Sequence, residues 1–304
     1  MLPTAVIADA ALAVGELQRR GELYTALPGV AGLRGDALAL FRQLEARIAS
    51  LARAVTSEEW MVPAAISLRT LARADYFVSF PQWLTTASHL AGDGSSLEAI
   101  ATADDPAAAA AGANGPAQAA LPPAVCYHVY EALAGRTLSR PATITAQCTC
   151  WRHEGAGTAA LERGWAFTMR EAVLIGADAE VIAFRADGIA RAVALAAELG
   201  FDAEVVEASD PFFMPTSRGR ALLQQVKSLK HELVVSIGGE RPLAIASFNH
   251  HESFFGRAFD IRLADGTPAS SGCVAFGLER WLLAWLCVHG PDARAWPSLR
   301  QVNP

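Results

Sequence analysis

The stretch Trp151-Arg152-His153-Glu154, followed across a glycine-rich loop by Arg163-Gly164-Trp165-Ala166-Phe167, decides the fold. Residues 142–152 are rich in β-branched side chains and alternate in character, which predicts a strand. The glycines around 155–157 break that strand, and residues 165–170 have the pattern of an antiparallel partner. The segment is therefore predicted to be a long hairpin with an open tip.

Residues that recur at three- and four-residue spacing predict helices elsewhere in the chain. The predicted helices start at Asp36 and at Pro122-Pro123, and three more cover 178–199, 217–229 and 276–288. The further predicted strands cover 203–206, 232–237, 243–248 and 258–263. Consecutive strands with short connections favour antiparallel pairing, so we expect an α+β fold with an antiparallel sheet flanked by helices.

We expect one catalytic domain over residues 1–304. Residues 1–100 would supply N-terminal helices and a dimerisation region, and residues 122–304 the core. Between them, 101–121 is almost entirely Ala, Gly, Asp and Pro, which predicts a loop or crossover.

Composition excludes several classes of protein. The net charge of −6 gives no basic field for a polyanion, so a nucleic-acid partner is disfavoured. The chain has neither a secretory pattern at its start nor an apolar run long enough to span a membrane, so we expect a cytoplasmic protein without a membrane partner. Five cysteines without a C-x-x-C pair suit neither a disulfide framework nor a zinc ribbon, and simple burial is the plain interpretation of each.

Two arginines occupy positions where a charge needs a partner. Arg152 ends a strand that has a buried pattern, and Arg280 begins an apolar helix. Triphosphate suits a guanidinium, which offers a planar fork of donors and a flat face for a purine. The alternative is a structural ion pair of Arg152 with Glu154 or of Arg280 with Glu279.

Other residues could complete a nucleotide site. Phe167 could meet adenine or belong to the core, and Glu232 and Glu279 could hold magnesium or be ordinary paired acids. Neither Gly-x-Ser-x-Gly nor a phosphate-binding P-loop occurs in the chain. Of the run Asn249-His250-His251, we expect only Asn249 to line a pocket.

Together these motifs resemble a known family. The Arg152-x-Glu154 strand, Arg163 with Phe167, and Gly277-Leu278-Glu279-Arg280 are similar to motifs 2 and 3 of class II aminoacyl-tRNA synthetases, closest to the seryl branch. With Cys126, Glu171 and Cys273, the chain more specifically resembles the amino acid:[carrier protein] ligases, truncated relatives of the archaeal-type seryl enzyme. The resemblance runs from about residue 122 to 290.

The resemblance implies roles for particular residues. Arg152 and Arg280 would be the catalytic residues, with Arg152 on the α-phosphate and Arg280 sandwiching adenine against Phe167. Glu154 would lie near the adenine amine and Glu232 near Mg²⁺. The whole implied ATP set is Arg152, Glu154, Arg163, Trp165, Phe167, Glu232, Asn249 and Arg280. The resemblance also implies a homodimer, with Phe80-Pro81 and the helix before it as motif 1.

Cys126, Glu171 and Cys273 would hold Zn²⁺, with Cys126 on a helix, Glu171 at a strand end and Cys273 in a turn. Three protein ligands leave one position open, which a neutral amine fits. The implied function is ATP-dependent activation of a small amino acid, glycine or alanine, to an aminoacyl-adenylate, followed by transfer to the phosphopantetheine thiol of a carrier protein.

The choice of acceptor rests on charge. The N-terminal third offers no basic arm for a tRNA, whereas the patch Ser217-Arg218-Gly219-Arg220 could steer an acidic carrier protein or be a solvated helix face. Two alternatives stay open: a tRNA-charging or tRNA-binding protein, and an inactive regulatory paralogue.

Overall fold

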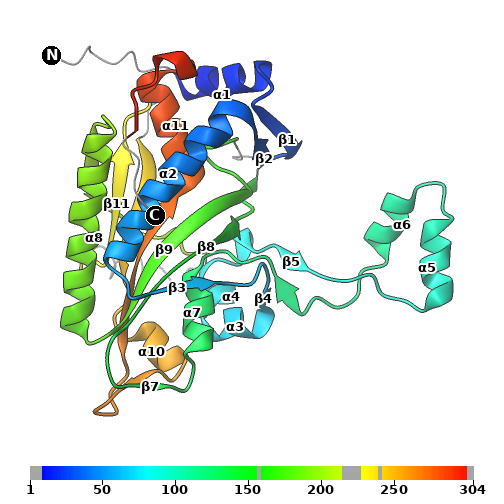
Figure 1. Cartoon of the computed structure of the whole chain (residues 1–304). Coiled ribbons are helices and arrows are strands. Elements are labelled where there is room, and N and C mark those ends of the chain that lie inside the picture. The colour runs from blue at the N-terminus through cyan, green and yellow to red at the C-terminus, as the bar shows by residue number, and fades with distance from the viewer. Residues whose placement is uncertain (1–8, 156–158, 214–226, 239–241, 300–304) are drawn as a thin grey trace.

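A seven-stranded sheet forms the body of the protein, as the computed structural model shows (Figure 1). The structure describes residues 9–155, 159–213, 227–238 and 242–299. The order of the strands across the sheet is β10-β11-β12-β14-β9-β8-β3, and all neighbours are antiparallel except β3 and β8. The strands are β3 (Glu58–Met61), β8 (Ala142–Trp151), β9 (Ala166–Gly176), β10 (Ala203–Glu207), β11 (Lys230–Val235), β12 (Leu243–His250) and β14 (Ser270–Gly277).

Helices cover both faces of this sheet. One face packs against the long helices α2 (Gly35–Ala54), α8 (Asp178–Glu198) and α11 (Leu278–His289), with α1 (Ala10–Arg19) against α11. The other face packs against the short helices α3 (Leu68–Arg73), α7 (Cys126–Ala132) and α10 (Phe254–Ala258), with α4 (Tyr76–Ser79) beside α3. Small pieces complete the fold: the hairpin β1 (Leu23–Leu27) and β2 (Val30–Leu33), the short strands β4 (Ile66–Ser67), β5 (Thr86–Ala87), β6 (Ala119–Ala120), β7 (Thr137–Leu138) and β13 (Arg262–Leu263), and the 3-10 turns Pro81–Trp83 and Ala293–Ala295.

Strand β14 is buried on both faces. Its successive side chains point to opposite sides of the sheet, and helices cover both sides. Val274 and Phe276 belong to the core under α8 and α11, and Cys273 and Ala275 to the core under α7. The sequence interpretation missed this strand: it predicted a strand at 258–263 and a turn at Cys273. The run Ser270-Ser271-Gly272 resembles a turn, yet Gly272 is needed there because a Cβ atom would lie 2.7 Å from a Val181 methyl group of α8.

Helix α8 confirms the helix predicted for 178–199, and its small and apolar residues face the sheet. Ile182 and Val193 are exposed, while Val181, Phe184 and Ala192 are buried. Close approach decides the orientation: a Cβ atom on Gly188 would lie 2.6 Å from a Val274 methyl group, so the small residues of α8 face the sheet.

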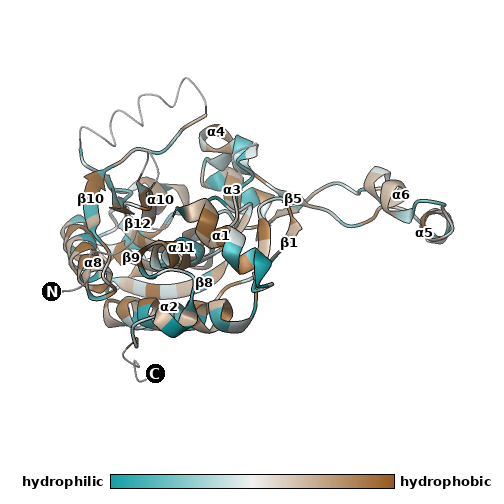
Figure 2. Cartoon of the chain, turned by 90° about the horizontal axis from the view of Figure 1, so that it is seen from above, coloured by the Kyte–Doolittle hydropathy of each residue, from teal (hydrophilic) through white to brown (hydrophobic). Residues whose placement is uncertain are grey.

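An arm projects from the body in both views of the chain (Figures 1 and 2). It carries α5 (Gly94–Ala101) and α6 (Pro106–Gly112), joined to the body near β5 and β6. The loop prediction for 101–121 is therefore wrong over α6. The Asp105 carboxylate caps that helix by accepting from the Ala108 amide at 3.0 Å, and five alanines follow Pro106.

Other predictions vary in outcome. The hairpin β8–β9 and helices α2 and α11 are confirmed, and β9 runs to Gly176, beyond the predicted Arg170. Most of the predicted helix 217–229, with its patch Ser217-Arg218-Gly219-Arg220, lies outside the described residues. Lys230 begins strand β11. In the described part of the chain, no helix has the length and apolar character needed to cross a membrane.

Removal of a ring from the doubly covered strand tests this packing. Phe276 is fully buried and contacts Trp281 with ring centroids 6.1 Å apart. We expect Phe276→Ala to lower the free energy of unfolding by about 3–5 kcal/mol, because it leaves a cavity between sheet and helix. In the matched control Leu12→Ala, whose side chain is 71% exposed, the change should stay within about 0.5 kcal/mol. Urea denaturation measures both, and equal effects would contradict this account of the core.

Candidate active site

Six of the eight residues assigned to ATP line one cavity on the sheet, between the β8–β9 hairpin and the start of α11. These residues are Arg152, Glu154, Arg163, Phe167, Glu232 and Arg280. The other two lie elsewhere. Trp165 donates from Nε1 to the Thr85 hydroxyl at 2.8 Å and contacts Trp151 edge to face, and Asn249 lines a second cavity. The structure therefore separates Trp165 and Asn249 from the nucleotide set.

The two arginines are fixed by backbone carbonyl groups. Arg280 donates to the carbonyl oxygens of Glu162 at 2.7 Å and Ala244 at 2.9 Å, and Arg152 donates to that of Pro123 at 3.0 Å. Neither guanidinium forms an ion pair with a described residue. Burial lowers the pKa of Arg280 below its usual value, as expected for a charge without a counterion. Both side chains are thus oriented while their charge stays available to an anion.

The structural ion pairs Arg152–Glu154 and Arg280–Glu279, which are the alternative to a nucleotide site, do not form. Glu154 pairs with Arg163 across the hairpin at 3.3 Å. Both carboxylate oxygens of Glu279 accept from the Thr168 amide, at 2.9 and 2.8 Å, and the Thr168 hydroxyl also donates to it at 2.9 Å. Glu279 therefore ties α11 to β9 beside Phe167, instead of neutralising Arg280.

A lysine that the sequence interpretation did not place in the site lies between the cavities. Lys230 lines both of them, with its ammonium 2.6 Å from Asp210 and 3.1 Å from Glu232. The Glu232 carboxylate thus has an ammonium partner here, and its magnesium role stays a prediction.

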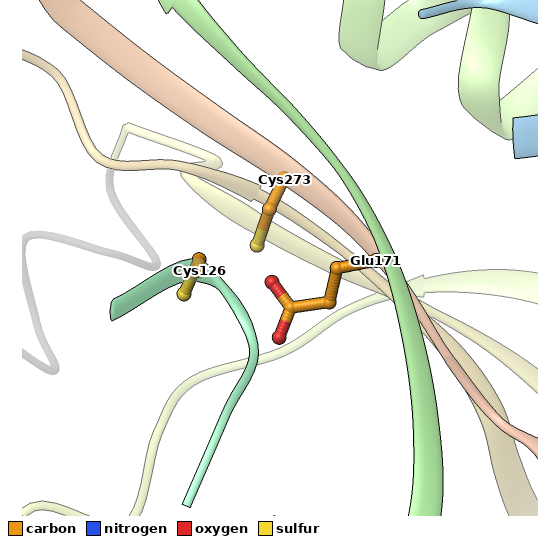
Figure 3. A group of neighbouring side chains, drawn as sticks. All are labelled: Cys126, Glu171 and Cys273. Atoms are coloured by element: carbon orange, nitrogen blue, oxygen red, sulfur yellow. The ribbon is translucent and has the colours of Figure 1, made fainter. Parts of the chain in front are cut away.

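The second cavity contains the three residues assigned to the metal (Figure 3). One potential ligand atom each from Cys126, Glu171 and Cys273 lies within 4.8 Å of the others, and all three residues are buried. Cys126 lies on a helix as predicted, but α7 begins at Cys126 itself and not at Pro122-Pro123. Glu171 lies within β9 and Cys273 within β14, so the predicted strand end and turn are both wrong.

Strand register brings the acid and the second thiol together. In the β9–β14 ladder, Glu171 lies opposite Ala275 and Cys273 lies opposite Val173, which makes Glu171 and Cys273 diagonal neighbours on one face. Helix α7 supplies Cys126 from above that face. Because the three candidate ligands come from distant parts of the chain, their local sequence carries no metal-binding spacing.

The chemistry of the cluster suits a divalent metal. Glu171 Oε1 accepts from the Val125 amide at 3.0 Å, while Oε2 is buried without a hydrogen-bond partner. Burial raises the pKa of Glu171, and contact with Cys273 together with burial raises that of Cys126 well above its usual value. Two sulfurs and an orphaned carboxylate oxygen are ligands that Zn²⁺ accepts, and a cation would offset the cost of burying them charged.

The two cavities share a wall. Arg152, Lys230 and Ser247 line both, together with Met169 and Ala275. A group bound at the cysteine cluster would therefore lie beside a nucleotide bound between the arginines. The rings of Tyr127 and Phe255, with centroids 5.9 Å apart and edge to face, line the second cavity but not the first.

The chain is similar in sequence to ligases of two kinds. No family model matches the chain. The amino acid–[acyl-carrier-protein] ligase 1 of Bradyrhizobium diazoefficiens is 35% identical over 266 residues, which span 86% of this chain and 81% of the relative. Ligase 2 of the same organism is 35% identical over 276 residues, spanning 89% and 81%. A type-2 serine–tRNA ligase of Methanopyrus kandleri is 30% identical over 193 residues, spanning 59% and 36%.

Solved structures agree on the fold. The M. kandleri seryl-tRNA synthetase, solved with an A. aeolicus tRNASec, superposes with a TM-score of 0.85 at 23% identity, over 98% of this chain and 60% of that one. A Giardia lamblia prolyl-tRNA synthetase, solved with prolyl-adenylate, gives 0.67 at 15% identity, over 92% and 53%. The predicted α+β fold of the class II synthetases is confirmed.

Titration of Glu279 tests the link between α11 and β9. Burial raises its pKa to about 7, from 4.5 for an unperturbed glutamate. At a pH between these two values, the Glu279 carboxyl is protonated in the folded protein and ionised in the unfolded chain. The stabilisation that comes from keeping this carboxyl protonated is therefore present at low pH and is lost as the pH rises through about 7.

The variant Glu279→Gln keeps an oxygen acceptor for Thr168 and cannot ionise. We expect the free energy of unfolding of the wild type, minus that of the variant, to fall as the pH rises from 5 to about 7.5. Urea denaturation across this range measures the difference, and a pH-independent difference would contradict the assignment.

Proposed function

Because the chain belongs to the amino acid–[acyl-carrier-protein] ligases, a family of ATP-dependent ligases, we propose that it activates a small amino acid as an aminoacyl-adenylate and transfers it to the phosphopantetheine thiol of a carrier protein. The observation that carries the proposal is the wall shared by the arginine cavity and the cysteine cluster. Two substrates bound in adjoining cavities are positioned to react with each other.

The first step joins the two substrates. ATP would lie between Arg152, Arg280 and Phe167, and a carboxylate oxygen of the amino acid would attack the α-phosphorus. The new carboxyl–phosphate bond forms as the bond to pyrophosphate breaks. Arg152 lies at the shared wall, so its guanidinium donates to the phosphate oxygens as negative charge develops there.

The amino group would be recognised at the other end. Cys126, Glu171 and Cys273 would hold Zn²⁺, which supplies an open coordination position for a neutral amine. Glycine or alanine is the proposed substrate, and the bulky aromatic rings of Tyr127 and Phe255 line the cavity that would receive it. Mg²⁺ on the triphosphate completes the proposed cofactors.

The second step releases AMP. The thiol of the carrier protein attacks the carbonyl carbon of the adenylate, and the carbonyl–phosphate bond breaks. The protein's share in this step is to hold the leaving phosphate, through Arg152 and Lys230 at the shared wall.

The proposal also includes a homodimer, and it excludes tRNA as the acceptor. The sheet ends at β3, where Met61 is 98% exposed, which supports an interface at that edge.

One set of assays separates the proposed function from its alternatives. We expect amino-acid-dependent exchange of pyrophosphate into ATP, and acylation of a phosphopantetheinylated carrier protein but not of tRNA. Charging of tRNA would establish the synthetase alternative. Absence of exchange with every amino acid would establish the inactive alternative.

Loss of one metal ligand provides a direct test. We expect Cys273→Ala to purify without Zn²⁺ and to lose pyrophosphate exchange. Elemental analysis and the exchange assay measure the two effects. The matched control Cys148→Ser removes a thiol that lies outside the cluster and should keep both properties. Exchange that survives both Cys273→Ala and chelation would refute the metal assignment.

Loss of an arginine tests the nucleotide cavity. We expect Arg280→Ala to slow amino-acid-dependent exchange by about 10²–10³-fold, because an oriented donor to the nucleotide is removed. The control Arg294→Ala changes a side chain that is 88% exposed and pairs with Asp292, and its exchange rate should match the wild type. Equal rates in the two variants would remove Arg280 from the site.

A further inference from the structure

Two side-chain nitrogens at the end of strand β12 lie near the sulfur of Cys273. Asn249 lies directly opposite Cys273 in the β12–β14 ladder, and its Nδ2 is 3.4 Å from the sulfur. His251 follows two residues later, and its Nε2 is 4.0 Å from the same sulfur. Both residues line the cavity that holds the cysteine cluster.

The amide of Asn249 is aimed at this sulfur by a neighbour on its own strand. Its Nδ2 also lies 3.3 Å from the Ser247 hydroxyl, so the two N–H bonds of the amide have separate acceptors. One reaches Ser247 and the other reaches Cys273. The strand thus fixes which proton points toward the cluster.

The imidazole of His251 is held on several sides. The Tyr130 hydroxyl lies 3.2 Å from its Nδ1 and the Ser271 hydroxyl 3.4 Å from it, while the Phe255 ring packs edge to face at 4.9 Å. Hydroxyl groups that donate to Nδ1 leave the ring proton on Nε2, the nitrogen that faces the cysteine.

We propose that Asn249 and His251 are positioning residues that donate N–H hydrogen bonds to the Cys273 thiolate and so orient it as a metal ligand. The inference rests on the proposed metal site and concerns groups beyond the three ligands. A hydrogen bond to a thiolate is charge-assisted, and it withdraws electron density from sulfur while fixing its lone pairs. Such outer partners of metal ligands govern both affinity and ligand geometry.

The test uses the metal-free full-length protein and two readouts other than activity. Competition with a chromophoric chelator gives the Zn²⁺ affinity, and Co²⁺ substitution gives the thiolate-to-cobalt charge-transfer band. We expect Asn249→Ala and His251→Phe each to weaken Zn²⁺ binding by about 10- to 100-fold. The band should move to longer wavelength, because a sulfur without the hydrogen bond gives up an electron more readily.

Conservative and distant variants separate positioning from simple damage. His251→Gln places an amide N–H near the position of Nε2. The Zn²⁺ affinity and the wavelength of the charge-transfer band should therefore return toward their wild-type values. Cys148→Ser should leave both unchanged. An Asn249→Ala variant whose charge-transfer band stays at the wild-type wavelength would overturn the proposal. Equal Zn²⁺ affinity and equal band position in His251→Phe and His251→Gln would also overturn it. A wild-type protein that binds no Zn²⁺ would instead overturn the proposed metal site, and this inference with it.

Discussion

The pairing register of β12, β14 and β9 is the constraint on which the rest of the molecule depends. Because β14 is covered on both faces, each of its side chains has an assigned environment. Val274 and Phe276 fill the core beneath α8 and α11, while Cys273 and Ala275 face α7. A slip of one residue would exchange the two sets, placing a thiol in the helical core and an aromatic ring in the site. Stability and site geometry are thus specified by the same ladder.

Orientation without an ion-pair partner among the described residues is the common feature of Arg152 and Arg280. Arg280 and Arg152 donate to backbone carbonyls, which hold a guanidinium in place but leave its positive charge uncompensated. Glu279, which could have neutralised Arg280, is occupied by Thr168. The cost of burying such charges is offset by the folded scaffold, and an anionic ligand meets donors that need no rearrangement.

The wall between the two cavities explains how one small domain can serve two substrates. Strand β11 brings Lys230 to this wall, and β8 ends there with Arg152. The first cavity is lined by several charged groups and Phe167, whereas the second is lined by aromatic rings, two thiols and the Glu171 carboxylate. This division matches two ligands of different chemistry that must meet at one point, as amino acid and α-phosphate do in the proposed reaction.

Elements with strong local signals can be derived from the amino-acid pattern alone. The period-two pattern of 142–152 and 165–170 specifies a hairpin, and the three- and four-residue spacing after Gly277 specifies a helix that begins with a charged residue. Arg152 and Arg280 stand out in the sequence as charges in apolar elements that need a partner, and both line the first cavity. The family resemblance added the ligand set, which no local spacing encodes.

Contacts between distant segments depend on the tertiary structure. It brings Cys126, Glu171 and Cys273 within reach of one another, places the Asn249 amide beside the Cys273 sulfur, and makes Lys230 part of the wall between the two cavities. It also made a central strand of Ser270–Gly277, whose small residues resemble a turn. The physical reason is that packing on both faces of a sheet depends on neighbours far along the chain, and these neighbours decide which small residues are buried and which polar groups meet.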